Sequence, residues 1–172
     1  MIDLETLGTK PYSTILNVSA VEFNLRTGET GKRFSSNISR QSCNKFGLEE
    51  DDSTLKWWKA YPDVYKSLLK NTFPLDQVCV DFASWLNQRC KHDNKYIWGH
   101  RLDYGLLENA FEVVAQPRPW HYFNERDIRA LFALHTIRRK VKGKGSKHNP
   151  IDDCLWQIEV LCKTVETLNA RF

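Results

Sequence analysis

With 172 residues, 41% of them hydrophobic and 27% charged, the chain has the length and composition of one globular domain, residues 1–172, with a single core. No apolar run reaches the length of a membrane span, and no signal peptide is recognisable. No pair of the five cysteines has zinc-ligand spacing, and their odd number argues against a secreted disulfide framework. We therefore expect a cytoplasmic protein with no membrane partner, and the net charge of +4 permits a polyanionic partner without requiring one.

The first predicted element is a strand that carries two acids. Residues 1–6 form a short apolar run that contains Asp3 and Glu5. Because residues two apart on a strand point to the same face, the two carboxylates should project side by side. Like charges this close repel each other, and a hard divalent cation such as Mg²⁺ or Mn²⁺ would offset the repulsion. The alternative is a solvated strand end with incidental acids.

Two more strands should follow the first. Residues 14–25 are almost continuously apolar or β-branched, and residues 32–38 alternate between polar and apolar types. Thr27-Gly28 supplies turn chemistry between them. We therefore expect the first three strands to form an antiparallel meander.

The rest of the chain is predicted to be mostly helical, which implies an α/β fold with helices packed on a mixed sheet. The apolar stripes and the proline positions indicate where the helices begin and end. In order, we expect a loop over 40–52, a short helix capped by Asp52 or Ser53, helices from Pro62 and from Leu75, a strand over 95–98, a helix over 103–115, a strand over 121–124, and helices over 125–138 and 150–168.

Asp103 begins an apolar helical stripe that continues through Leu106, Leu107 and Ala110. An acid in this position points inward, and at the N-terminus of a helix the dipole favours a carboxylate. Simple helix capping is the alternative. A third inward acid is what a metal site beside the first strand would need.

The segment from His148 to Asp153 contains a helix start. Asn149 can act as the N-cap and Pro150 as the first helical residue, which leaves His148 just before the helix. Asp152 and Asp153 flank the apolar stripe on opposite sides, so periodicity alone leaves open which of them faces the first strand. A well-capped helix with N-terminal acids is the alternative interpretation.

Together these segments resemble the DEDDh group of the DnaQ-like 3′–5′ exonucleases. The residues occur in order: Asp3 and Glu5 in MIDLETLG, Asp103 in IWGHRLDYGLLENAF, and His148 with Asp153 in HNPIDDCLWQ. STLKWWKAYPD and RDIRAL look like the branch of phage DexA-type exonucleases and related bacterial 3′–5′ exoribonucleases. The resemblance covers almost the whole chain and selects Asp153 over Asp152. It implies a ribonuclease H-like fold with a mixed five-stranded sheet flanked by helices.

The resemblance also implies a two-metal mechanism that releases nucleoside 5′-monophosphates from the 3′ end of single-stranded nucleic acid. Asp3, Glu5, Asp103 and Asp153 would hold two Mg²⁺ or Mn²⁺ ions about 4 Å apart, and His148 would be the general base. DNA is the favoured substrate, an exoribonuclease is the alternative enzyme, and a non-catalytic nucleic-acid-binding protein is the rival from another class. Relatives suggest a homodimer.

Further residues are expected to contact the substrate. The segment 136–147 holds six Lys or Arg and no acid, so it can track phosphates, although a solvated loop is the alternative. A tryptophan can stack on a terminal base, and His100 stands where this group often has glycine or asparagine. The expected substrate contacts are Leu4, Thr6, Leu7, Trp57, Trp58, His100, Arg138, Arg139 and Lys140.

Overall fold

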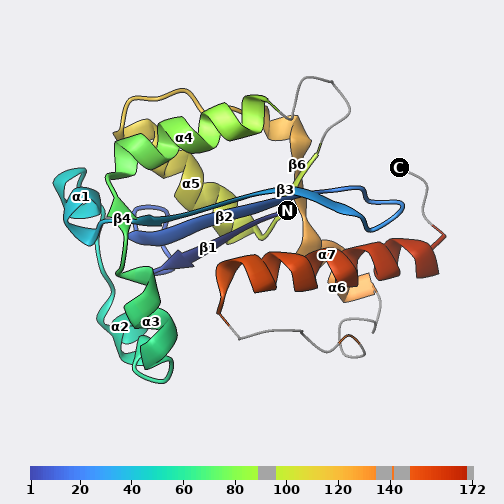
Figure 1. Ribbon diagram of the computed structural model, residues 1–172, viewed down its shortest axis with the longest axis horizontal. Helices are drawn as coiled ribbons and strands as arrows, with labels where there is room; N and C mark the ends of the chain where they lie inside the picture. The colour runs from blue at the N-terminus through green and yellow to red at the C-terminus, as the bar shows by residue number, and fades with distance from the viewer. Residues whose placement is uncertain (89–95, 135–140, 142–147, 170–172) are drawn as a thin grey trace.

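A four-stranded mixed sheet forms the centre of the computed structural model, which describes residues 1–88, 96–134, 141 and 148–169 (Figure 1). Its first three strands are antiparallel neighbours, as the sequence predicted, and the fourth is a short strand that pairs in parallel with the third. The strands are β1 (Ile2–Thr6), β2 (Ile15–Phe23), β3 (Thr30–Ile38) and β4 (Thr72–Phe73).

Two further strands, β5 (Ile97–Gly99) and β6 (Glu125–Asp127), form a separate parallel pair. β5 lies directly beside β1, because a Cβ atom on Gly99 would come within 2.7 Å of the Ile2 side chain. Glycine is therefore required at this close approach. The prediction of one five-stranded sheet is not confirmed: the described strands form a sheet of four and a pair.

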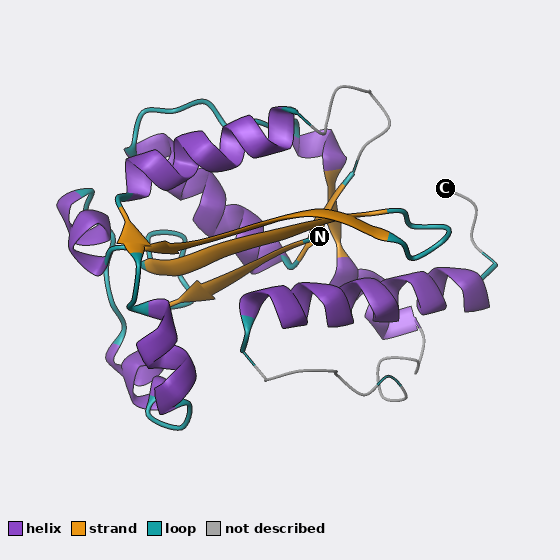
Figure 2. Ribbon diagram, viewed as in Figure 1, coloured by secondary structure: helices purple, strands orange, loops and turns teal. Residues whose placement is uncertain are grey.

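Helices cover both faces of the sheet (Figures 1 and 2). α4 (Leu75–Asn87) and α5 (Arg101–Val113) lie on one face, while α7 (Pro150–Thr167) with α6 (Ile128–Leu134) lies on the other. β1 contributes to both layers, because Ile2 and Leu4 join the hydrophobic cluster that includes α4 and α5, whereas Met1 joins the cluster that includes α7. Because successive side chains of a strand point to opposite faces, Asp3 and Glu5 point toward α7.

Three short helices precede α4. They are α1 (Arg40–Lys45), α2 (Asp52–Trp58) and α3 (Pro62–Leu68). α1 corrects the loop predicted over 40–52: the Ser39 hydroxyl accepts a hydrogen bond from the Ser42 amide, and Cys43 is buried against the core. α2 is capped by Asp51, one residue earlier than predicted.

The second half of the chain differs from the prediction mainly in element boundaries. Residues 122–124 form a 3₁₀ turn rather than a strand, and the strand β6 follows immediately. α6 starts after β6, at a point where the Asp127 carboxylate accepts a hydrogen bond from the Arg129 amide at 2.8 Å. α7 confirms the predicted last helix.

Two observations bear on the predicted protein class. Cys43, Cys79, Cys154 and Cys162 are free thiols, and Cys90 lies outside the described residues. Within the described ranges, no helix combines the length and the apolar character needed to cross a membrane.

Candidate metal centre

Two buried acids stand side by side on β1. Asp3 is 8% exposed and Glu5 is 7% exposed, and they pair across the sheet with Ser19 and Asn17 of β2. Both point to the α7 face, because the alternate residues Ile2 and Leu4 fill the opposite face. The prediction that these two carboxylates project together from a strand is confirmed.

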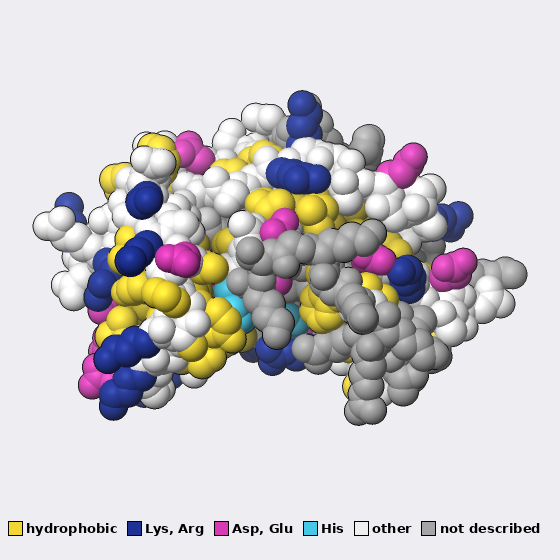
Figure 3. All heavy atoms as spheres, turned by 60° about the horizontal axis from the view of Figure 1, so that its bottom comes forward, with side chains coloured by type: hydrophobic (Ala, Val, Ile, Leu, Met, Phe, Trp, Pro, Cys, Tyr) yellow, Lys and Arg dark blue, Asp and Glu magenta, His cyan; other side chains and the backbone are white. Residues whose placement is uncertain are grey.

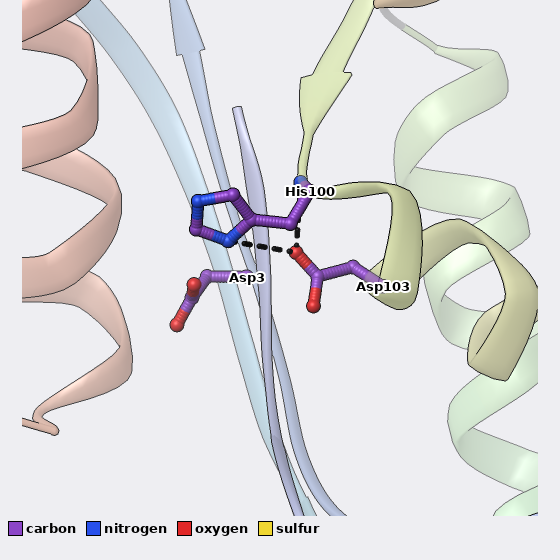
Figure 4. Close-up of side chains that lie close together, drawn as sticks. All are labelled: Asp3, His100 and Asp103. Atoms are coloured by element: carbon purple, nitrogen blue, oxygen red, sulfur yellow. Dashed lines mark hydrogen bonds and ion pairs between the residues drawn. The ribbon is translucent and has the colours of Figure 1, made fainter. Parts of the chain in front are cut away.

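The first turn of α5 supplies a third buried acid. The backbone N–H of His100 donates a hydrogen bond to Oδ2 of Asp103 at 3.0 Å, so the carboxylate caps the helix and is held in place by it. Nδ1 of His100 lies 3.7 Å from the same oxygen. Figure 4 shows His100 and Asp103 beside Asp3, and one ligand atom from each lies within 4.8 Å of the others.

A second group forms where α7 begins. Asn149 caps the helix through the Asp152 amide, which leaves Asp153 on the side that faces β1. Glu5, His148 and Asp153 offer ligand atoms within 4.8 Å of one another. The structure therefore confirms that Asp153 rather than Asp152 joins the β1 acids, a choice that helical periodicity could not make.

Gln157 is a site residue that the sequence analysis missed. It lies one turn after Asp153 and is 3% exposed, and its Nε2 donates a hydrogen bond to Oδ1 of Asp3 at 2.8 Å. Its Oε1 is buried without a hydrogen-bond partner in the described part of the chain. The i, i+4 spacing from Asp153 was the available signal, because such residues share one helix face.

The electrostatics of the cluster are unfavourable when it holds only acids. Burial, followed by the neighbouring carboxylate of Asp103, raises the pKa of Asp3 well above its ordinary value. Burial, followed by Asp3, raises the pKa of Glu5 to about 9. Burial is also the largest cause for Asp103, whose pKa rises to about 7, and for Asp153, whose pKa rises to about 6.

The residues of the cluster fit divalent cations. Four carboxylates with raised pKa values need positive charge in order to ionise, and their oxygens are the ligands that Mg²⁺ and Mn²⁺ prefer. The unpaired Oε1 of Gln157 adds a buried acceptor that a cation-bound water can satisfy. The two ligand groups, Asp3–His100–Asp103 and Glu5–His148–Asp153, meet at neighbouring positions of β1.

His148 packs against an aromatic wall made of Trp57, Trp58 and Tyr61. Its ring centroid lies 4.7 Å from that of Trp57 and 4.4 Å from that of Tyr61. Trp58 is fully buried and donates its indole N–H to the Thr6 carbonyl at 2.9 Å, which fixes the wall to the end of β1. Figure 3 shows histidine and acidic side chains beside a hydrophobic patch on this face of the molecule.

The other expected substrate contacts lie in different surroundings. Leu4 and Leu7 are buried in hydrophobic clusters, and the Thr6 hydroxyl donates to the Gly8 carbonyl at 2.7 Å. Trp57 is 43% exposed and is therefore accessible from solvent. The basic residues Arg138, Arg139 and Lys140 lie outside the described residues. Contact of all these residues with a substrate stays a prediction.

Comparison with known proteins gives one family. The model of the 3′–5′ exoribonuclease Rv2179c-like domain matches residues 1–165. The match spans nearly the whole chain and contains every residue of the acidic cluster. No curated protein matches the chain.

Proposed function

The chain belongs to the Rv2179c-like 3′–5′ exoribonuclease domain family, and from this premise we propose that it is a metal-dependent 3′–5′ exonuclease of the DEDDh, DnaQ-like type. The observation that carries the proposal is the convergence of four buried or half-buried carboxylates and two imidazoles, those of His100 and His148, beside β1. A ribonuclease H-like arrangement, a relationship to the DexA branch and a cytoplasmic location belong to the same proposal.

Asp3, Glu5, Asp103 and Asp153 would hold two divalent cations. When bound, Mg²⁺ or Mn²⁺ lowers the pKa of a coordinated water and stabilises the charge on the leaving 3′ oxygen. The protein contributes the fixed carboxylates: β1 sets the spacing of Asp3 and Glu5, the helix cap holds Asp103, and Gln157 holds Asp3 from α7. Such preorganised ligands leave little reorganisation for the reaction itself.

His148 would accept the proton of the attacking water. A neutral imidazole is available for this near pH 7. The residue has φ of 63°, and its backbone forms a hydrogen bond with Asp153 that partly offsets the rise in the pKa of that carboxyl caused by burial. The left-handed backbone, this hydrogen bond and the aromatic wall together hold the ring next to Glu5 and Asp153.

RNA with a single-stranded 3′ end is the substrate that we propose. The family description names an exoribonuclease, whereas the expectation of DNA has no finding behind it. Leu4, Thr6 and Leu7, the partly exposed Trp57, and the basic residues Arg138, Arg139 and Lys140 would contact the strand. We also propose a homodimer, which sedimentation in the ultracentrifuge would test.

The test is product analysis on RNA and DNA of one sequence. We expect chromatography to show nucleoside 5′-monophosphates that appear from the first turnover, faster from RNA than from DNA, because the 2′-hydroxyl is what distinguishes the two strands. An RNA whose 3′ end is base-paired in a duplex is the control and should be degraded slowly. Nucleoside 3′-monophosphates, or oligonucleotides without mononucleotides, would contradict the proposed reaction.

A further inference from the structure

We propose that His100 is a nitrogen ligand of the cation held by Asp3 and Asp103, and that this ligand makes the site favour Mn²⁺ over Mg²⁺. The inference rests on the proposed function only in that a cation is present, and it deepens that function by naming the cation. The resemblance to the exonuclease group places His100 among the substrate contacts, whereas a cation ligand has a different partner.

The backbone places His100 at the junction of two elements. β5 ends at Gly99, and α5 begins at Arg101, so His100 is the N-cap residue between them. The backbone N–H of His100 donates a hydrogen bond to Asp103 at 3.0 Å, and the His100 side chain is only 18% exposed. The backbone that carries the imidazole is therefore held in place by the strand, the helix cap and the residues that cover the side chain.

The distances match the coordination of one ion. Ligand atoms that each lie about 2.1 Å from a cation are separated from one another by about 3.0 Å when adjacent and by about 4.2 Å when opposite. Nδ1 of His100 is 3.7 Å from Oδ2 of Asp103, between these values. The full set with Asp3 lies within 4.8 Å, so a shift of a few tenths of an ångström per side chain closes it (Figure 4).

A second observation at the same place points to a bound group. Gln157 is buried, and its Nε2 holds Asp3, whereas its Oε1 has no hydrogen-bond partner within the described residues. A buried acceptor left in this state costs free energy, and a water in the hydration shell of a cation would satisfy it. The unpaired amide oxygen therefore favours a hydrated cation over a simple His100–Asp103 ion pair, which would leave Gln157 unchanged.

The imidazole changes which cation the site prefers. A site made of carboxylates and water suits Mg²⁺, whereas a neutral nitrogen ligand favours transition metals, and Mn²⁺ accepts both kinds of ligand. The second ligand group, with Glu5 and Asp153, keeps its carboxylates in either case. We therefore expect Mn²⁺ to bind at least about 10-fold more tightly than Mg²⁺, and the advantage to come from His100.

The experiment is metal titration of the metal-free protein by calorimetry, together with electron spin echo spectroscopy of the Mn²⁺ form. His100→Asn removes the imidazole but keeps a good N-cap residue. This variant should lose the nitrogen coupling to Mn²⁺ and at least about 10-fold of the Mn²⁺-over-Mg²⁺ preference. His148→Gln is the matched control, because it removes the other imidazole of the cluster and should keep both the coupling and the preference.

Unchanged nitrogen coupling in His100→Asn would overturn the inference, and so would coupling that disappears only in His148→Gln. Absence of Mn²⁺ binding to the unaltered protein would overturn it as well. His100→Ala, checked for an intact fold by circular dichroism, must agree with the Asn variant. Nitrogen coupling in a protein without nuclease activity would refute the proposed function alone, whereas nuclease activity without the coupling would refute this inference alone.

Discussion

At the scale of single residues, the central feature is that carboxylates on three elements share one buried site. Asp3 and Glu5 come from β1, Asp103 from the first turn of α5, and Asp153 from the first turn of α7. Each carboxylate has a raised pKa, and burial is the largest cause in every case. Residues arranged at this cost are typical of functional sites.

The neighbouring acids Asp152 and Asp153 give a matched pair of variants. Asp153→Asn should lower the rate of RNA degradation by at least about 100-fold. Loss of a residue that only supports a metal ligand lowers activity by up to about 100-fold, and loss of a ligand itself should cost at least as much. Asp152→Asn should stay within about 3-fold, because the carboxylate is outside both ligand groups. Initial rates at saturating Mn²⁺ check this. Equal losses in the two variants would contradict the assignment of Asp153.

At the scale of elements, the short α2–α3 unit is a support for His148 rather than a separate subdomain. Trp58 anchors it to β1 through the Thr6 carbonyl, and Trp57 and Tyr61 contact the imidazole. Aromatic contacts of this kind contribute about 0.5–1.5 kcal/mol each. The wall can therefore set the orientation of the ring without touching a cation.

A double-mutant cycle tests the support of His148 by Trp57. Trp57→Leu should lower kcat by about 10-fold with little change in KM. The His148 ring would lose its contact with Trp57 but would keep its contact with Tyr61 and the backbone hydrogen bond with Asp153. In the His148→Ala background, the same substitution should cost nothing further, since residues that act as a unit are not additive. A raised KM with unchanged kcat, additive in both backgrounds, would instead mean that Trp57 stacks on the substrate.

At the scale of the whole molecule, the stability of the metal-free protein should depend on pH. The folded-state pKa values of Glu5, Asp103 and Asp153 lie at about 9, 7 and 6, all above their ordinary values. The folded state therefore binds more protons than the unfolded state over this range, and its stability must fall as pH rises. Below the ordinary pKa values both states are protonated, and this destabilisation is absent.

Thermal unfolding of the metal-free protein measures the effect. The free energy of unfolding should fall between pH 6 and pH 9, and Glu5→Gln should reduce that fall by about 1–4 kcal/mol, because one proton per pH unit corresponds to about 1.4 kcal/mol. Added Mn²⁺ should raise Tm more at pH 8 than at pH 6, since protons compete for the same oxygens. If Glu5→Gln kept the pH slope of the unaltered protein, the buried Glu5 carboxyl could not be the cause of the fall.

The features that could be predicted from the sequence are those with a local period. The period of two on β1 put Asp3 and Glu5 on one face, and the helical period turned Asp103 inward. Tyr122 and Phe123 favour a strand by propensity, yet they lie in a 3₁₀ turn, where the two residues are 53% and 65% exposed. A strand there would need a partner, and the strand that pairs with β5 begins only at Glu125.

Contacts between distant segments could not be predicted. The hydrogen bond from Gln157 to Asp3 joins residues 154 positions apart. The i, i+4 spacing places Gln157 on the same helix face as Asp153, but it does not identify Asp3 as the partner. The packing of Trp57 on His148 likewise depends on how α2 and α7 meet around β1. The choice of Asp153 over Asp152 was reached by resemblance and then confirmed by the geometry.

The most direct measurement is a gel time course of single-stranded RNA labelled at its 5′ end, with Mn²⁺ or with EDTA. We predict a ladder that shortens one nucleotide at a time from the 3′ end, only with the cation, and no ladder from Asp3→Asn, because Asp3 belongs to the cluster that holds the cations. Intact RNA under all conditions with binding retained, or the same ladder from Asp3→Asn, would contradict the assignment of this cluster as the active site.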